Sequence, residues 1–159
     1  DLVTLVPEKR EEVTTEGGLD VIKSEDKLKG IIQRLTDQDI PVSIFVDPVQ
    51  EQLEICAEIK AGWIELHTGK YAISKNNERD LELSILKEST AKAQSYGLRV
   101  NAGHGLTYQN VERIAAIQGI EELNIGHTII SRALAVGLTQ AVKEMKYLII
   151  NPRKENGFL

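Results

Sequence analysis

Two kinds of apolar pattern alternate along the whole sequence. Short runs rich in valine and isoleucine predict buried strands, and the longer stretches between them, with apolar residues every three or four positions, predict amphipathic helices. The expected strands are residues 2–6, 42–46, 63–66, 98–101 and 123–125. This alternation predicts an α/β fold in which right-handed crossovers join the strands of a parallel sheet.

A helix is expected after each strand. In the first helix we expect Ser24 as the N-cap, and in the second Pro48 in the first turn. The third helix is expected over residues 78–95, and the fourth with Thr107 as its N-cap. The last helix is expected as one continuous stripe formed by Ile130, Leu134, Leu138, Ala141 and Met145. Five strand–helix units fit either an open, doubly wound sheet or part of an eight-unit barrel, which takes about 250 residues.

Composition excludes several classes of protein. The 159 residues carry 19 basic and 24 acidic side chains, a net charge of −5, which argues against nucleic acids and anionic membranes as partners. No apolar run is long enough to span a bilayer. The single cysteine, Cys56, falls in a helical stripe and is expected in the core, so we expect no disulfide and a cytoplasmic location.

One connection is unusually long for this kind of fold. Residues 7–18 are mostly charged or polar, whereas connections after strands usually have about two to six residues. Because the loop follows a strand directly, we predict a binding loop or lid, with Gly17 and Gly18 as its hinge. The alternative is a surface loop without a functional role.

All three histidines follow expected strands, at the edge of the sheet where sites form in parallel α/β folds. In the segment 101–107, His104 lies between two glycines, and a helix is expected to begin just after it. Glycines let a ligand approach the backbone, and a helix N-terminus offers N–H groups to an anion. The segment therefore predicts an anion site with an acid–base residue, and the alternative is a tight turn with a structural histidine.

Two further positions are candidates for the same site. Gly126 and His127 form a second glycine turn into a helix, although His127 could be merely the first residue of that helix. Glu65 and His67 share one face of their strand by alternation, and Glu65 is either an acid–base group or a structural ion-pair partner. No spacing of cysteines and histidines matches a metal site, and no glycine motif for nucleotides is present.

Several of these segments together resemble one family, the pyridoxine 5′-phosphate synthases. The segments that carry the resemblance are LVPEKR (5–10), VTTEGGLD (13–20), IELHTG (64–69), NAGHGLTY (101–108) and LNIGH (123–127). They occur in order over residues 1–147, and the two longer strings at 5–20 and 101–108 are highly specific in combination.

The resemblance implies a TIM barrel of which residues 1–147 form units four to eight, with residues 148–159 as a C-terminal tail. The first three units have no counterpart in this sequence. The implied reaction condenses 1-deoxy-D-xylulose 5-phosphate with 3-amino-2-oxopropyl phosphate and releases pyridoxine 5′-phosphate, phosphate and water. It proceeds by acid–base steps, so no cofactor and no metal are implied. A homo-oligomer is also implied.

By resemblance, His104 is the proton donor and Glu65 assists the transition state electrostatically. Gly105, Gly126 and His127 bind the phosphate of the aminoketone, and Thr14 contacts the sugar phosphate. Two other catalytic residues of the family have no counterpart here. One alternative is a catalytically incomplete barrel fragment that binds phosphate or assembles with other chains. Another is a different sugar-phosphate barrel, such as an aldolase or epimerase, which requires a Schiff-base lysine or metal ligands; the one lysine near the end of an expected strand is Lys70.

Overall fold

The computed structural model describes residues 2–7 and 17–152. Its centre is a parallel sheet of five strands in the order β1-β2-β3-β4-β5. The strands are β1 (Val3–Leu5), β2 (Val42–Val46), β3 (Trp63–His67), β4 (Arg99–Gly103) and β5 (Ile120–Asn124). The last strand starts earlier than expected, because β5 lies at the edge of this sheet, where acidic residues such as Glu121 stay hydrated.

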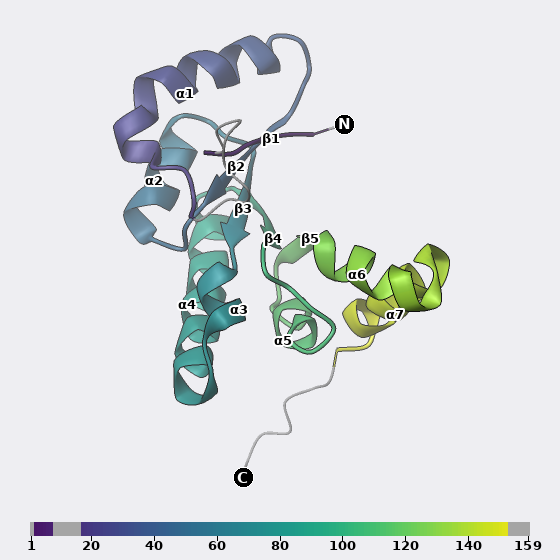
Figure 1. Ribbon diagram of the computed structural model, residues 1–159. Helices are drawn as coiled ribbons and strands as arrows, with labels where there is room; N and C mark the ends of the chain where they lie inside the picture. Colours follow the sequence, from purple (N-terminus) through teal and green to yellow (C-terminus); the bar gives the residue numbers. More distant parts are fainter. Residues whose placement is uncertain (1, 8–16, 153–159) are drawn as a thin grey trace.

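Helices connect the strands and follow the last one (Figure 1). They are α1 (Val21–Thr36), α2 (Gln50–Glu58), α3 (Gly69–Ile73), α4 (Asn76–Ser95), α5 (Val111–Ala115), α6 (His127–Val136) and α7 (Leu138–Ile150). Across the described ranges, no helix has the length and apolar character that a membrane span requires.

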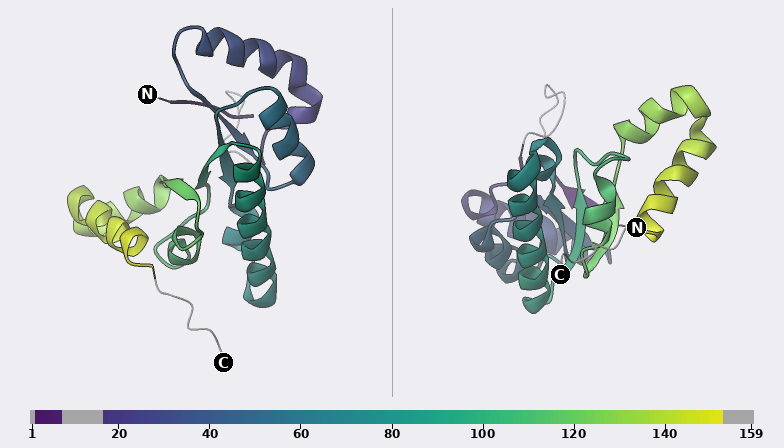
Figure 2. Two further views of the ribbon diagram at one scale, coloured as in Figure 1. Left: turned by 180° about the vertical axis from the view of Figure 1, so that it is seen from behind. Right: turned by 90° about the horizontal axis from the view of Figure 1, so that it is seen from below.

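The strands follow one another across the sheet in chain order, without a change of direction. A doubly wound sheet reverses its strand order at one point and carries helices on both faces. The described sheet has no such point, and α1, α2 and α4 gather on the same side of it (Figure 2). The sheet is therefore singly wound.

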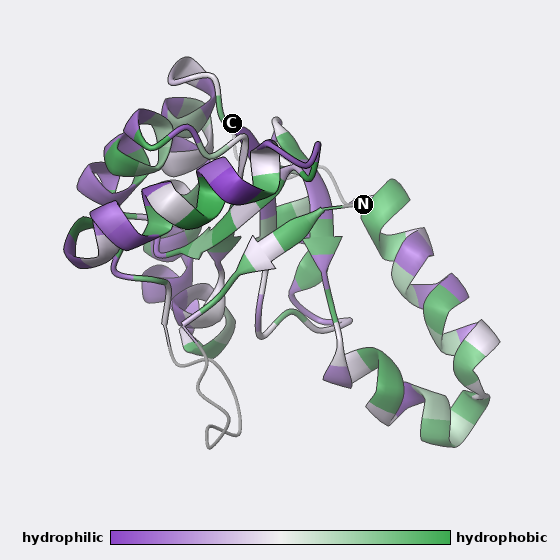
Figure 3. Cartoon of the chain, turned by 90° about the horizontal axis from the view of Figure 1, so that it is seen from above, coloured by the Kyte–Doolittle hydropathy of each residue, from purple (hydrophilic) through white to green (hydrophobic). Residues whose placement is uncertain are grey.

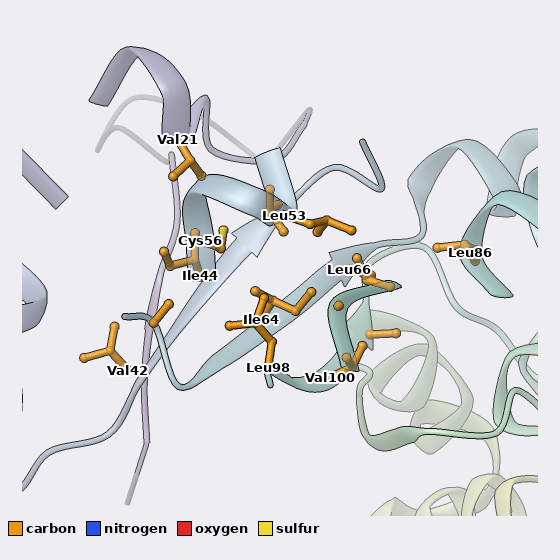
Figure 4. Close-up of a cluster of buried hydrophobic side chains, with 14 of the residues drawn as sticks. Val21, Val42, Ile44, Leu53, Cys56, Ile64, Leu66, Leu86, Leu98 and Val100 are labelled. Carbon is orange, nitrogen blue, oxygen red and sulfur yellow. The ribbon is translucent and has the colours of Figure 1, made fainter. Parts of the chain in front are cut away.

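The two faces of the sheet differ in polarity because side chains alternate along each strand. On one face, Ile44, Ile64 and Val100 are fully buried in an apolar cluster with α1, α2, α4 and α5 (Figure 4). The opposite face carries mostly polar side chains, which the parallel register aligns from strand to strand: Thr4, Ser43, Glu65, His67 and Asn101. The helix-covered face holds the fold together, and the opposite face carries buried polar side chains, among them Ser43, Glu65 and Asn101.

At the amino ends of the strands, an arginine joins β3 to β5. The guanidinium carbon of Arg99 lies 3.6 Å from the centroid of the Trp63 ring. The Nε atom of Arg99 also donates to both carboxylate oxygens of Glu121, at 2.9 and 3.1 Å. Planar stacking together with a forked ion pair fixes this end of the sheet.

The helix starts differ from three expectations. Asp20, not Ser24, caps α1, because its carboxylate accepts a hydrogen bond from the Lys23 N–H at 3.3 Å. Pro48 precedes the first turn of α2, and Asn110, not Thr107, is the residue before α5. Helix α3 was not expected, because its five residues are too few to display a helical repeat.

The expected single stripe from Ile130 to Met145 is wrong. Gly137, with a φ of +80°, separates α6 from α7, and the two helices form a hairpin that projects from the sheet (Figure 3). Ala141 and Met145 are buried, but Leu134 is 89% exposed. Helix α6 is apolar without a buried residue, because the hairpin projects from the sheet and α6 packs mainly against α7.

We expect Leu53→Ala to lower the free energy of unfolding by about 2–5 kcal/mol, because Leu53 is fully buried and truncation leaves a cavity. The matched control, Leu134→Ala, should change it by less than about 0.5 kcal/mol, as exposed substitutions usually do. Urea unfolding of both variants measures the difference. An equal loss in the two variants would show that Leu134 is covered in solution.

Candidate active site

The principal cavity opens at the carboxyl ends of the strands and has a volume of about 510 Å³. Its lining residues are Val6, Phe45, Glu65, His104, Gly105, Leu106, Thr107, Asn124, Ile125, Gly126, His127 and Thr128. The cavity thus brings together five of the six residues predicted from the sequence. The sixth, Thr14, lies outside the described residues.

The turn after β4 places His104 in the cavity wall. His104 has a φ of +82° and Gly105 a φ of +73°, so two consecutive residues are left-handed. A non-glycine residue in this region is strained, at a cost of about 1–3 kcal/mol. The Thr68 hydroxyl lies 2.6 Å from the Gly103 carbonyl oxygen and 2.5 Å from that of His104, and its hydrogen is shared between them. Thr68 therefore holds the strained turn in place.

A second set of bonds secures the residues after His104. The Asn110 side chain accepts a hydrogen bond from the Thr107 N–H at 2.7 Å and donates one to the Gly105 carbonyl at 3.2 Å. The buried Tyr71 of α3 donates its hydroxyl proton to the Asn110 carbonyl at 2.7 Å. Asn110 and Tyr71 were not among the expected site residues, and their only signal in the sequence is a position just beyond the segments 101–108 and 64–69.

Two glycines are required by close contacts. A Cβ atom at Gly105 would lie 2.6 Å from the Cβ of Ala72, in addition to its positive φ. A Cβ atom at Gly103 would lie 2.2 Å from the Oε1 of Glu65. The glycines around His104 therefore allow the β4 turn to approach α3 and the Glu65 carboxyl group.

Glu65 lies in the cavity wall with 8% of its surface exposed. The Asn124 side-chain amide donates a hydrogen bond to its Oε2 at 2.7 Å. Burial raises the pKa of the Glu65 carboxyl group, and this hydrogen bond opposes the effect only in part. A carboxyl group with a raised pKa in a cavity suits proton transfer or the stabilisation of positive charge.

His67 is buried beside this cavity and does not line it. Its Nδ1 lies 2.8 Å from the Oδ1 of Asp47, the residue that follows β2. This hydrogen bond lowers the pKa of the Asp47 carboxyl group, and the N–H of Gly18 contributes to the same effect. Asp47 was not among the expected site residues, although its place at the end of a strand is a signal in the sequence.

The N-terminus of α6 forms the other wall. Gly126 precedes the helix, and His127 and Thr128 occupy its first turn beside the cavity. Free N–H groups at a helix N-terminus attract anions. Among the described residues, no lysine or arginine lines the cavity, so this wall offers backbone N–H groups, the His127 imidazole and the Thr128 hydroxyl as donors. Within residues 2–7 and 17–152, no cluster of three potential metal ligands occurs.

Fold and cavity define a class: an α/β protein with a singly wound parallel sheet and a polar site at the carboxyl ends of its strands. Comparison with known proteins gives the family. Residues 1–151 match the family model described as "Pyridoxal phosphate biosynthesis protein PdxJ". The chain belongs to this family.

Curated relatives carry the name pyridoxine 5′-phosphate synthase. The protein of Prochlorococcus marinus (strain NATL1A) is 84% identical over 159 residues, which are 100% of this chain and 65% of the relative. That of Synechococcus sp. (strain WH7803) is 63% identical over 155 residues, which are 98% of this chain and 63% of the relative. The chain thus spans slightly less than two thirds of the length of these relatives.

We expect Gly105→Ala to destabilise the protein by more than the cost of a left-handed alanine, about 1–2 kcal/mol, because the new methyl group also meets Ala72. The control is Gly97→Ala, since Gly97 has a φ of +84° and open space around it. Urea unfolding compares the two variants. Equal losses would contradict the close contact.

The raised pKa of Glu65 predicts a pH dependence of stability. Protonated Glu65 contributes stability that is fully present below its ordinary pKa of 4.5 and is lost as the pH rises through the raised value. Glu65→Gln should therefore be more stable than the parent at neutral pH and match it near pH 4.5. Urea unfolding between about pH 4 and pH 8 measures this difference.

Glu54→Gln is the control, because the pH dependence of stability that its carboxyl group contributes has the opposite sign. Hydrogen bonds, chiefly from the Tyr96 hydroxyl, lower the pKa of the Glu54 carboxyl group. The stability that ionised Glu54 contributes is present above its ordinary pKa and is lost as the pH falls, so this variant should be less stable than the parent at neutral pH. If Glu65→Gln followed the parent at every pH, burial of the Glu65 charge would carry no cost.

Proposed function

We propose that this chain is the catalytic C-terminal part of a pyridoxine 5′-phosphate synthase. The reaction condenses 1-deoxy-D-xylulose 5-phosphate with 3-amino-2-oxopropyl phosphate and releases pyridoxine 5′-phosphate, phosphate and water. The observation that carries the proposal is the shared cavity of Glu65, His104 and two glycine turns. Membership of the family and the names of the relatives support it.

We propose that the five units are the fourth to eighth of a TIM barrel. A singly wound sheet with helices on its apolar side and polar residues on the other has the polarity of a barrel wall around its interior. The described sheet ends in two open edges, β1 and β5. Three further units would join these edges and remove the unpaired backbone groups.

In the proposed mechanism, the Nε2 or Nδ1 proton of His104 is delivered to the leaving or carbonyl oxygen during imine formation and dehydration. The fixed turn of His104 supports this role, because Thr68 and Asn110 hold its backbone. Glu65 lies in the same cavity and stabilises positive charge that develops on the imine nitrogen.

Phosphate binding is proposed for Gly105, Gly126 and His127. The two glycine turns line the same cavity, and the second turn leads directly into α6. A helix N-terminus contributes about 0.3–2 kcal/mol for an anion, whereas micromolar binding needs about 8 kcal/mol. Other groups must therefore contribute, and we propose Thr14 and the loop 7–18 among them.

Competing functions have less support. A Schiff-base aldolase requires a lysine in the cavity, and Lys70, the candidate from the sequence, does not line it. A fragment that only binds phosphate would not need the buried Glu65 beside His104. We also propose that the protein is cytoplasmic and uses small phosphorylated substrates. We further propose that it forms a homo-oligomer, which the exposed apolar residues of α6 and α7 support.

A chimera tests this function. This chain replaces the matching 159 residues of the Prochlorococcus marinus (strain NATL1A) relative, and formation of pyridoxine 5′-phosphate from the two substrates is measured. We expect activity comparable to that of the relative. A folded chimera without activity would contradict the proposal, and full activity of the isolated chain would contradict the need for further units.

In this chimera, His104→Ala should lower kcat by about 10²- to 10⁴-fold with little change in substrate affinity, as loss of a general acid does. Gln109→Ala is the control, because Gln109 is exposed on the same loop and does not line the cavity. Unchanged turnover of His104→Ala would remove His104 from the mechanism.

A further inference from the structure

We propose that Asp47 and His67 are positioning residues that hold the imidazole ring of His104 in its working orientation. The proposal rests on the function proposed above and adds two residues that neither the family resemblance nor the motifs assign. They follow or end neighbouring strands, since β2 ends at Val46, β3 at His67 and β4 at Gly103. The three side chains therefore form a row across the carboxyl edge of the sheet.

The first contact in this row is a hydrogen bond. The Asp47 carboxylate is an acceptor only, so the Nδ1 of His67, 2.8 Å from its Oδ1, carries the proton. The other nitrogen, Nε2, is buried and has no hydrogen-bond partner among the described residues. It lies over Gly69, where a Cβ atom would be 2.4 Å away. His67 is thus fixed in one tautomer and orientation.

The second contact is between rings. The centroids of His67 and His104 are 5.0 Å apart, and the edge of one ring faces the plane of the other at 68°. Phe45 packs against both rings, with centroid distances of 5.1 Å to His67 and 6.4 Å to His104. Because His67 does not line the cavity, it acts on the reaction through His104 rather than by touching substrate.

The Asp47 carboxylate has a second hydrogen-bond donor besides His67. It accepts a hydrogen bond from the Gly18 N–H, and the neighbouring Leu19 N–H donates to the Phe45 carbonyl at 2.8 Å. A Cβ atom at Gly18 would lie 2.1 Å from the Asp47 nitrogen, so only glycine fits there. The expected hinge residue Gly18 therefore lies locked against the end of β2.

Asp47→Asn and His67→Asn in the chimera test the proposal by kinetics. Asp47→Asn keeps the shape of the side chain at position 47 but weakens its hydrogen bond to His67. His67→Asn removes the ring that packs on His104. We expect kcat to fall about 10- to 100-fold in each variant while KM changes less than about twofold, because misplacement of a reacting group affects the chemical step. Asp80→Asn, which breaks an exposed ion pair with Arg113, is the control and should keep both constants.

Either of two kinetic outcomes overturns the proposal: unchanged kcat in both folded variants, or a raised KM at unchanged kcat. Circular dichroism and thermal unfolding identify a variant that fails to fold, and the other variant then decides.

A second measurement does not depend on the reaction. The sequence contains three histidines, so the imidazole ¹⁵N spectrum of this chain is readily assigned. We expect His67 to show a protonated Nδ1, and the His104 signals to shift or broaden in Asp47→Asn but not in Asp80→Asn. His104 signals unchanged in Asp47→Asn would overturn the positioning role. If the parent chimera forms no product yet these signals respond, the proposed function fails and the positioning contact stands.

Discussion

The parallel, in-register alignment of the strands is the constraint on which the site depends. All five strands run in the same direction, so their carboxyl ends meet at one edge, and side chains of equal parity line up on one face from β1 to β4. Glu65 and Asn101 are neighbours for this reason, as are His67 and Gly103. A register shift between Val100 and Asn101 pairs Asn101 with Glu122 of β5. The site residues are far apart in the chain and meet because β2, β3, β4 and β5 are parallel neighbours in the sheet.

Much of the fold follows from local patterns. The α/β class, the parallel sheet and the approximate strands are predictable, because buried runs and helical stripes are properties of adjacent residues. The break at Gly137 was not, since the stripe through Leu134 and Ala141 continues across it in a helical repeat. The positive φ of Gly137 and the projection of the α6–α7 hairpin from the sheet are features of the tertiary structure, which hydrophobic periodicity does not contain.

The site residues likewise divide into those that the sequence predicts and those that it does not. Glycines beside a histidine are visible in the sequence, and the cavity indeed contains Glu65 and His104. The residues that support them were not predictable, because each acts across a long separation: Asp47 is 20 residues from its partner His67, and Tyr71 is 39 from Asn110. Their identities, an acid after a strand and a tyrosine in a short helix, are common in sites and in ordinary structure alike.

The stacking of Arg99 on Trp63 bears on where the protein can accept amino-acid substitutions. It ties β3, β4 and β5 together at their amino ends, whereas the cavity opens at their carboxyl ends. Rigidity and chemistry are therefore supplied by opposite ends of the same strands. Substitutions that improve thermal tolerance can accumulate at the amino ends without disturbing substrate recognition, and new specificities can arise in the cavity loops while the sheet remains intact.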